Sequence, residues 1–250
     1  MQLDFWEQKL AFEYPFTISN GRTKTHQHSL MIRLSLGNWQ GFGEAPAIVY
    51  YNVTVEAMME QLEKSRKLIE KFALIDPERF WHFLHHLFPK DPFLVSALDM
   101  AGWDLFGQMQ KQPIHQIWNL PWNENTPTPI CDYTLGIDSI DKMVEKMKAH
   151  PWPIYKVKVG TDYDIEMITA LRKHTDKPIR VDANAGWTTE EALQKIPAFA
   201  ALGVELVEQP LAKDNWEGME QLKKQSVLPL FADEKSVYNQ ADIAWILVAT

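Results

Sequence analysis

The sequence predicts an α/β protein in which a TIM-type (β/α) barrel follows a smaller α+β region. From about residue 126 onward, apolar strand-like runs alternate with helical runs, and one strand–helix pair recurs roughly every 25 residues. Acidic residues recur at the ends of successive strands, which is where the active site of such a barrel lies. An open doubly wound sheet is the alternative, although no glycine-rich phosphate loop follows the first strand.

Residues 1–125 have mixed character, and we predict an α+β domain there. The expected strands are 3–12 and 29–36, and the segment GNWQGFGEAP carries the glycines of a turn and a short strand. The expected helices are 55–72, 76–87 and 91–112. WHFLHH in the second helix has metal-ligand side chains at helical spacing, but we expect an exposed helix face. The proline- and asparagine-rich segment NLPWNENTPTP predicts a domain boundary near residue 125.

Residues 126–250 read as five strand–helix pairs, a partial (β/α) barrel. The expected strands are PICDYTL, IYKVKV, PIRVDA, VELVEQ and LPLFADE, and the expected helices are 139–150, 162–174, 188–202, 215–225 and 239–248. Because side chains alternate along a strand, Val157 and Val159 should share the face that packs against helices. Lys156 and Lys158 should then share the opposite face, towards the strand-end acids.

Three acidic residues close three successive expected strands. Glu208 follows Asp182 by 26 residues, Asp233 follows Glu208 by 25, and Lys158 precedes Asp182 by 24. Successive strand ends meet at one face of a barrel, so these side chains should converge. Carboxylates that share a pocket repel each other unless a positive charge compensates them, and an all-oxygen ligand set suits Mg²⁺, or Mn²⁺ as a substitute. Each acid could instead cap a helix or lie in a surface loop.

Composition limits the partners and the compartment. The net charge of −8 argues against nucleic acid or an anionic membrane as the main partner, and no apolar run reaches the ~18 residues of a membrane span. The single cysteine, Cys131, excludes an internal disulfide and fits a reducing compartment. MQLDFWEQKL lacks the apolar core of a signal peptide, so we expect a cytoplasmic protein. The sequence leaves open whether the chain forms a homo-oligomer.

Taken together, these residues resemble the enolase superfamily and, within it, the muconate-lactonizing subgroup. The resemblance covers essentially the whole chain and rests on KVK at 156–158, DANAGW at 182–187, VEQPL at 207–211, ADE at 232–234, GFGEAP and SALDMAGWDLFGQ. It implies a (β/α)₇β barrel with an α+β capping domain. It also implies that Asp182, Glu208 and Asp233 bind Mg²⁺. Lys158 would be an acid/base, and Lys156 its electrostatic and carboxylate-binding neighbour.

Within the subgroup the chain is most similar to dipeptide epimerases of the L-Ala-D/L-Glu type. PFTISNGRTKTH resembles their capping-domain loop, where an arginine meets a substrate carboxylate, and Arg22 falls there with one extra residue before it. CDYTLGID resembles their first barrel strand and places Thr134 at the substrate. The resemblance implies Mg-dependent epimerisation of an Ala-Glu-like dipeptide by α-proton abstraction through an enediolate.

Alternatives to this activity stay open. Muconate cycloisomerases and o-succinylbenzoate synthases share the ligands and lysines, and Arg22 could be a solvated loop residue. The family's barrel needs three further units, on the order of 75 residues at this pace. We therefore expect a longer natural protein whose second acid/base lysine and ammonium-binding acids lie beyond Thr250. The competing class is a truncated, non-catalytic relative, and the 250-residue chain alone should bind metal poorly and lack epimerase activity.

Overall fold

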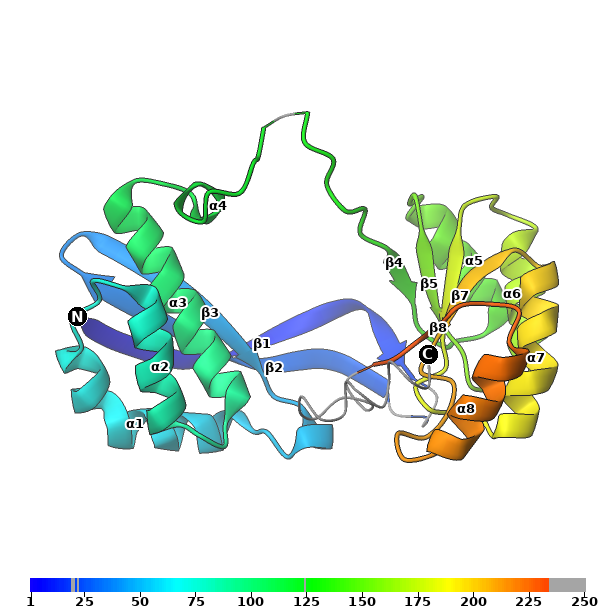
Figure 1. Ribbon diagram of the computed structural model, residues 1–250, viewed down its shortest axis with the longest axis horizontal. Helices are drawn as coiled ribbons and strands as arrows, with labels where there is room; N and C mark the ends of the chain where they lie inside the picture. Colours follow the sequence, from blue (N-terminus) through cyan, green and yellow to red (C-terminus); the bar gives the residue numbers. More distant parts are fainter. Residues whose placement is uncertain (19–20, 22, 124, 234–250) are drawn as a thin grey trace. The chain divides into compact units, whose positions relative to one another are not determined.

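The chain divides into two compact units (Figure 1). A computed structural model describes residues 1–18, 21, 23–123 and 125–233. Unit 1 consists of Met1–Glu13 and Thr25–Pro127, and unit 2 consists of Tyr14–Lys24 and Thr128–Thr250. The expected helix at 239–248 lies outside the described residues. Within the described part of the chain, no helix combines the length and apolar composition that crossing a membrane requires.

Unit 1 is built on a three-stranded sheet with the order β1-β2-β3. Its elements are β1 (Gln2–Thr17), β2 (Thr23–Leu36), β3 (Trp39–Pro46), the 3₁₀ helix η1 (Val49–Tyr51), α1 (Val55–Lys71), α2 (Pro77–Leu87), α3 (Pro92–Gln110) and α4 (Ile114–Ile117). Residues 14–17 of β1 and 23–24 of β2 belong to unit 2. All the predicted strands and helices of this region are confirmed. β2 begins six residues earlier than predicted, because its first half is largely exposed and lacks the alternating apolar pattern that marks a strand.

Aspartate caps fix the starts of two of these helices. The Asp76 side chain accepts a hydrogen bond from the Glu78 backbone N–H, and the Asp91 side chain accepts one from Leu94. In each case a proline occupies the first turn, where its missing N–H removes no helical hydrogen bond. The two Asp-Pro pairs therefore mark the starts of α2 and α3.

Helix α3 packs directly on the backbone of β3, and two glycines make this approach feasible. A Cβ atom built at Gly43 would lie 1.9 Å from the Ala97 carbonyl oxygen, and one at Gly41 would lie 2.2 Å from the Ala101 carbonyl oxygen. Side chains larger than hydrogen would push the helix off the sheet. The buried core beside this contact includes Leu34 of β2 and other apolar side chains of α1, α2 and α3.

Unit 2 contains a parallel sheet with the order β4-β5-β6-β7-β8. Its elements are β4 (Tyr133–Leu135), α5 (Ile140–Ala149), β5 (Tyr155–Lys158), α6 (Asp164–Arg172), β6 (Ile179–Asp182), α7 (Thr189–Ala201), β7 (Val204–Glu208), α8 (Trp216–Gln225) and β8 (Leu230–Phe231). The predicted strand–helix alternation is confirmed for the residues that the structure describes. The helices cover one face of the sheet (Figure 1).

The strand faces are divided as the alternating pattern predicts. Val157, Val181 and Val207 are fully buried in the core formed with the helices. Lys156 and Lys158 alternate with the buried Tyr155 and Val157 of β5 and lie on the opposite face. This division leaves the second face of the sheet to the charged residues.

Replacing Gly43 by Ala tests the close packing of α3 on β3. The added methyl group meets backbone atoms that cannot rotate away, so we expect the free energy of unfolding to fall by about 3 kcal/mol, the upper part of the usual overpacking range. Urea denaturation followed by circular dichroism measures the change. Gln40→Ala, at an exposed position of the same strand, is the control and should stay within about 0.5 kcal/mol. Equal stabilities of the two variants would contradict the packing described here.

Candidate metal and acid–base site

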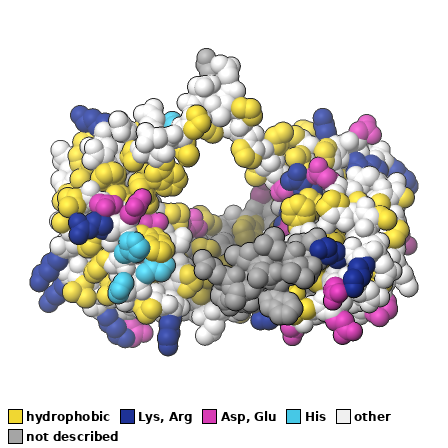
Figure 2. Space-filling view, viewed as in Figure 1, with side chains coloured by type: hydrophobic (Ala, Val, Ile, Leu, Met, Phe, Trp, Pro, Cys, Tyr) yellow, Lys and Arg dark blue, Asp and Glu magenta, His cyan; other side chains and the backbone are white. Residues whose placement is uncertain are grey.

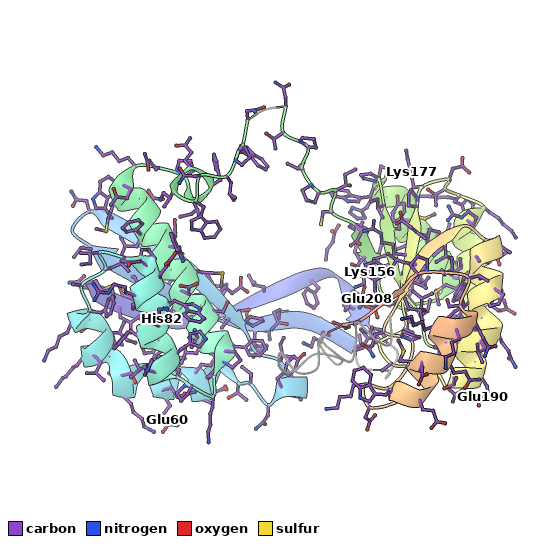
Figure 3. The ribbon with its side chains drawn as sticks, in the orientation of Figure 1. Glu60, His82, Lys156, Lys177, Glu190 and Glu208 are labelled. Atoms are coloured by element: carbon purple, nitrogen blue, oxygen red, sulfur yellow. The ribbon has the colours of Figure 1, made fainter. Side chains whose placement is uncertain are left out.

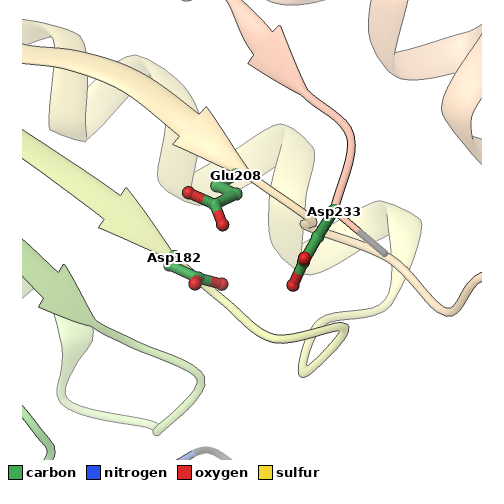
Figure 4. A group of neighbouring side chains, drawn as sticks. All are labelled: Asp182, Glu208 and Asp233. Atoms are coloured by element: carbon green, nitrogen blue, oxygen red, sulfur yellow. The ribbon is translucent and has the colours of Figure 1, made fainter. Parts of the chain in front are cut away.

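Three carboxylates come together at the carboxyl ends of β6, β7 and β8 (Figure 4). Asp182 and Glu208 are the last residues of their strands, and Asp233 lies two residues after β8. One carboxylate oxygen of each residue lies within 4.8 Å of those of the other two. The parallel register places Asp182 directly beside Glu208. The one-unit spacing in the sequence thus becomes a cluster of acids at one end of the sheet.

Two partly buried ammonium groups lie among these acids. Lys156 Nζ is 2.7 Å from both carboxylate oxygens of Glu208 (Figure 3) and 3.0 Å from Oδ2 of Asp182. Lys158 Nζ is 2.6 Å from the same Asp182 oxygen. The Lys158 side chain is 11% exposed and that of Asp182 is 1% exposed. The lysine face of β5 therefore contacts the acids rather than solvent, and the five groups together carry one net negative charge when all are ionised.

The pairing shifts the protonation equilibria of the site. Burial alone disfavours the Asp182 carboxylate, but the charges of Lys158 and Lys156 and the Asn184 backbone N–H outweigh it, so the pKa of Asp182 lies below its usual value. Burial raises the pKa of Glu208, and the negative charge of the nearby Asp182 raises it further. The hydrogen bond from Lys156 lowers this pKa but does not outweigh the other two effects. Burial opposes the Lys156 ammonium, yet its two acidic partners raise its pKa.

The chain beside the acids adopts strained backbone conformations. Asn184, Ala185 and Gln209 have φ values of 45°, 61° and 39°, in the left-handed region that residues other than glycine rarely adopt. Each such residue costs on the order of 1 kcal/mol and persists only where its surroundings fix it. All three follow Asp182 or Glu208 within three residues, so half of the six non-glycine residues with positive φ in the described part of the chain lie beside the acid cluster.

A fourth acid, Asp164, is fully buried nearby and is not part of the cluster. Its carboxylate accepts hydrogen bonds from the backbone N–H groups of Gly160 (3.0 Å) and Thr161 (2.8 Å), from Trp187 Nε1 (2.9 Å) and from Lys195 Nζ (2.8 Å). Gly160 follows β5, and Trp187 lies in the loop after β6. Asp164 therefore joins the loop that follows Lys158 to the loop that follows Asp182.

The role of Asp164 could not be predicted from the sequence, because its main partners are distant in the chain. Lys195 lies 31 residues away and Trp187 lies 23 residues away. Only the short spacing from Gly160 to Asp164, at a strand-to-helix connection, gives a local signal. That spacing does not distinguish a buried acid that accepts several hydrogen bonds from an ordinary acidic residue in a loop.

Of the two residues expected to contact substrate, the structure describes Thr134 but not Arg22. Thr134 on β4 pairs with Lys156 on β5, so the two side chains lie on the same face of the sheet. Arg22 lies outside the described residues.

The histidines of WHFLHH lie on an exposed face of α2, as predicted. Figure 2 shows histidine side chains gathered on the surface of unit 1, and Figure 3 labels His82 among them. The Nδ1 atoms of His85 and His86 lie 3.1 and 2.9 Å from the carbonyl oxygens of Trp81 and His82, one turn earlier. Among the described residues, the acid cluster is the one group of three or more metal-ligand side chains close enough to share an ion.

Comparisons with known proteins identify related chains. Residues 139–249 match the family described as "Enolase C-terminal domain-like". The L-Ala-D/L-amino acid epimerase of Flavobacterium johnsoniae is 43% identical over 244 residues, which cover 98% of this chain and 71% of that protein. The enzyme of the same name from a Maribacter species is 40% identical over 237 residues, covering 95% and 69% of the two chains.

Solved structures show the same relationship. The substrate-liganded L-Ala-D/L-Glu epimerase of Bacillus subtilis matches with a TM-score of 0.84 and 26% identity, over 99% of this chain and 71% of that one. The dipeptide epimerase of Enterococcus faecalis, complexed with Mg and L-Leu-L-Tyr, matches with a TM-score of 0.82 and 28% identity, over 96% and 69%. The chain belongs to the enolase superfamily, and its similarity to epimerases of that superfamily makes it an isomerase.

Removing the Asp164 carboxylate tests its role in joining the loops after β5 and β6. Asp164→Asn leaves the Lys195 ammonium without its buried partner, so we expect the free energy of unfolding to fall by about 3–5 kcal/mol in urea denaturation. The double variant Asp164→Asn/Lys195→Met removes both charges and should recover part of this loss. Glu220→Gln, which breaks an exposed pair with Lys224, is the control and should change stability little. An Asp164→Asn protein as stable as that control would contradict the role.

Proposed function

We propose that the protein epimerises Ala-Xaa dipeptides, with Ala-Glu as the first substrate to test, by removing the α proton and returning it on the opposite face. The observation that carries the proposal is the contact of two partly buried lysines with Asp182 and Glu208, two of the three carboxylates clustered at one end of a parallel sheet. The epimerase names of the similar proteins favour a dipeptide over a muconate or succinylbenzoate substrate. Because the chain spans 71% and 69% of its two relatives, the proposal concerns the full-length protein.

The acid cluster would hold Mg²⁺, with Mn²⁺ as a substitute. Asp182, Glu208 and Asp233 offer carboxylate oxygens within 4.8 Å of one another, and an all-oxygen donor set suits these hard cations. The site also carries excess negative charge that the two lysines compensate only in part. A bound Mg²⁺ would stabilise the negative charge that develops on the substrate carboxylate as the α proton leaves.

Lys158 would move the proton at the α carbon. Its Nζ atom lies on the acid face of the sheet and is largely shielded from solvent. Lysine is among the side chains that act as general acids and bases. Lys156, between Glu208 and Asp182, would supply positive charge beside the substrate carboxylate. Both lysines lie on β5 and hence on one side of the substrate. Inversion needs proton transfer on two faces, so a second base would lie on the opposite side.

The remaining assignments concern substrate selection. Thr134, beside Lys156 on the neighbouring strand, would contact the dipeptide substrate. Arg22 would meet a side-chain carboxylate such as that of Glu, an assignment supported by the resemblance of its loop alone. The larger architecture, a (β/α)₇β barrel with a capping domain of about residues 1–125, is part of the same proposal and is supported by the fold of the structural relatives.

Replacing Glu208 by Gln tests the metal assignment. The variant keeps the shape of the side chain but removes one ligand charge. We expect the metal affinity to fall about 100-fold or more and turnover to be lost. Changing a residue that only contacts a metal ligand typically lowers the affinity about 10–100-fold, so loss of a ligand itself should cost at least as much. Isothermal titration calorimetry with Mg²⁺ measures the affinity. Glu205→Gln, on the same strand outside the cluster, should bind as the unaltered protein does. Full activity of Glu208→Gln in the presence of EDTA would refute the assignment.

Replacing Lys158 by Ala tests the proton transfer. In the full-length protein we expect loss of Ala-Glu epimerisation, measured by proton NMR in D₂O, because one face of the α carbon loses its base. Solvent exchange should survive for the one epimer whose α proton faces the second base. Lys177→Ala removes an exposed lysine at the opposite end of β6 and should retain activity (Figure 3). If Lys158→Ala still interconverted the epimers, another group would be the base on that face.

A further inference from the structure

Gln209 follows Glu208 directly, and its backbone joins three strand ends. Its N–H donates to the Phe231 carbonyl oxygen at the end of β8, at 2.9 Å. Its own carbonyl oxygen accepts a hydrogen bond from the Ala185 N–H, at 2.8 Å, in the loop after β6. These two bonds hold Gln209 in its left-handed conformation and link the chain beside all three acids.

The Gln209 side chain extends this link to the third acid. The residue is 1% exposed, and its Oε1 atom accepts a hydrogen bond from the Asp233 backbone N–H at 3.1 Å. Its Nε2 atom donates to the Leu211 carbonyl oxygen at 2.8 Å. The second bond fixes the orientation of the amide, because only the oxygen can then face the Asp233 N–H.

Asp233 needs such a contact more than the other two acids do. Asp182 and Glu208 are the last residues of β6 and β7, and they are paired with each other in the parallel sheet. The pairing of β7 with β8 ends at Phe231, two residues before Asp233. The side chain of Gln209 thus reaches past the end of the ladder to the backbone of the third acid.

We propose that Gln209 is a positioning residue that holds Asp233 at the distance from Asp182 and Glu208 at which the three carboxylates share one ion. The proposal rests on the metal assignment given under Proposed function. It assigns no contact between Gln209 and the substrate or the metal. Its action is through the backbone of Asp233.

The chemistry of the amide explains why glutamine suits this position. A methionine of similar length would leave the Asp233 N–H and the Leu211 carbonyl without these partners. A glutamate would keep the acceptor for Asp233 but lose the donor to Leu211 and add a fourth negative charge beside Glu208. Glutamine is neutral and supplies both an acceptor and a donor.

The test compares Gln209→Met with Gln221→Met, the same change at an exposed position of α8. Binding of Mn²⁺ to the full-length protein is measured from the free-ion electron paramagnetic resonance signal, at a temperature where each variant is folded by circular dichroism. We expect Gln209→Met to bind about 10- to 100-fold more weakly than the unaltered protein, the usual effect of losing a group that orients a ligand. Gln221→Met should bind normally.

A second measurement, in the metal-free protein, distinguishes loss of the Gln209–Asp233 contact from a general loss of stability. In amide hydrogen exchange by NMR, the Asp233 N–H of Gln209→Met should exchange about tenfold faster or more, whereas the N–H of residue 209 should keep its protection. Gln209→Glu keeps the acceptor and should restore the protection of Asp233. Equal Mn²⁺ affinity of Gln209→Met and the unaltered protein, or unchanged Asp233 exchange, would overturn the proposal. If the unaltered protein bound no Mn²⁺, the metal assignment would fail by itself, and the exchange result would still decide whether Gln209 holds Asp233.

Discussion

The compensation of clustered carboxylates by two partly buried lysines is the interaction on which the rest of the site depends. Two carboxylates no more than 4.8 Å apart repel each other by at least about 3.5 kcal/mol at an effective dielectric constant of about 20. Lys156 and Lys158 offset this repulsion by direct contacts of 2.6 to 3.0 Å. A divalent cation bound at the cluster would compete with the ammonium groups for the same carboxylate oxygens, and its binding would then release the lysines towards a substrate.

The fold keeps these charges together through its loops as well as its strands. Parallel pairing sets Lys158 beside Asp182 and Asp182 beside Glu208. Beyond the strand ends, Asp164 ties the loops after β5 and β6, and Gln209 ties the chain around β6, β7 and β8. The sheet therefore brings the charged residues near one another, and buried polar side chains fix the loops that carry them.

The sequence could predict the features that repeat. The strand–helix alternation, the one-unit spacing of the acids and the lysine face of β5 all follow from periodicity, and the structure brings these residues together. It could not predict contacts that only the folded chain creates. Tyr14 and Thr17 belong to unit 2, where Tyr14 contacts His150 and the Thr17 carbonyl accepts from Ile137, and these partners lie more than 100 residues away. The contacts of Gln209 and Asp164 also form only in the folded chain, so the sequence did not reveal them. The metal and substrate roles stay predictions.

A crystal structure of the full-length protein grown with Mn²⁺, with anomalous data collected at the manganese edge, tests the central claim most directly. The account predicts one strong anomalous peak bound by carboxylate oxygens of Asp182, Glu208 and Asp233, with the Lys156 and Lys158 ammonium groups displaced from those oxygens. A manganese peak bound elsewhere, or no peak at the acid cluster while both lysines keep their contacts, would contradict it.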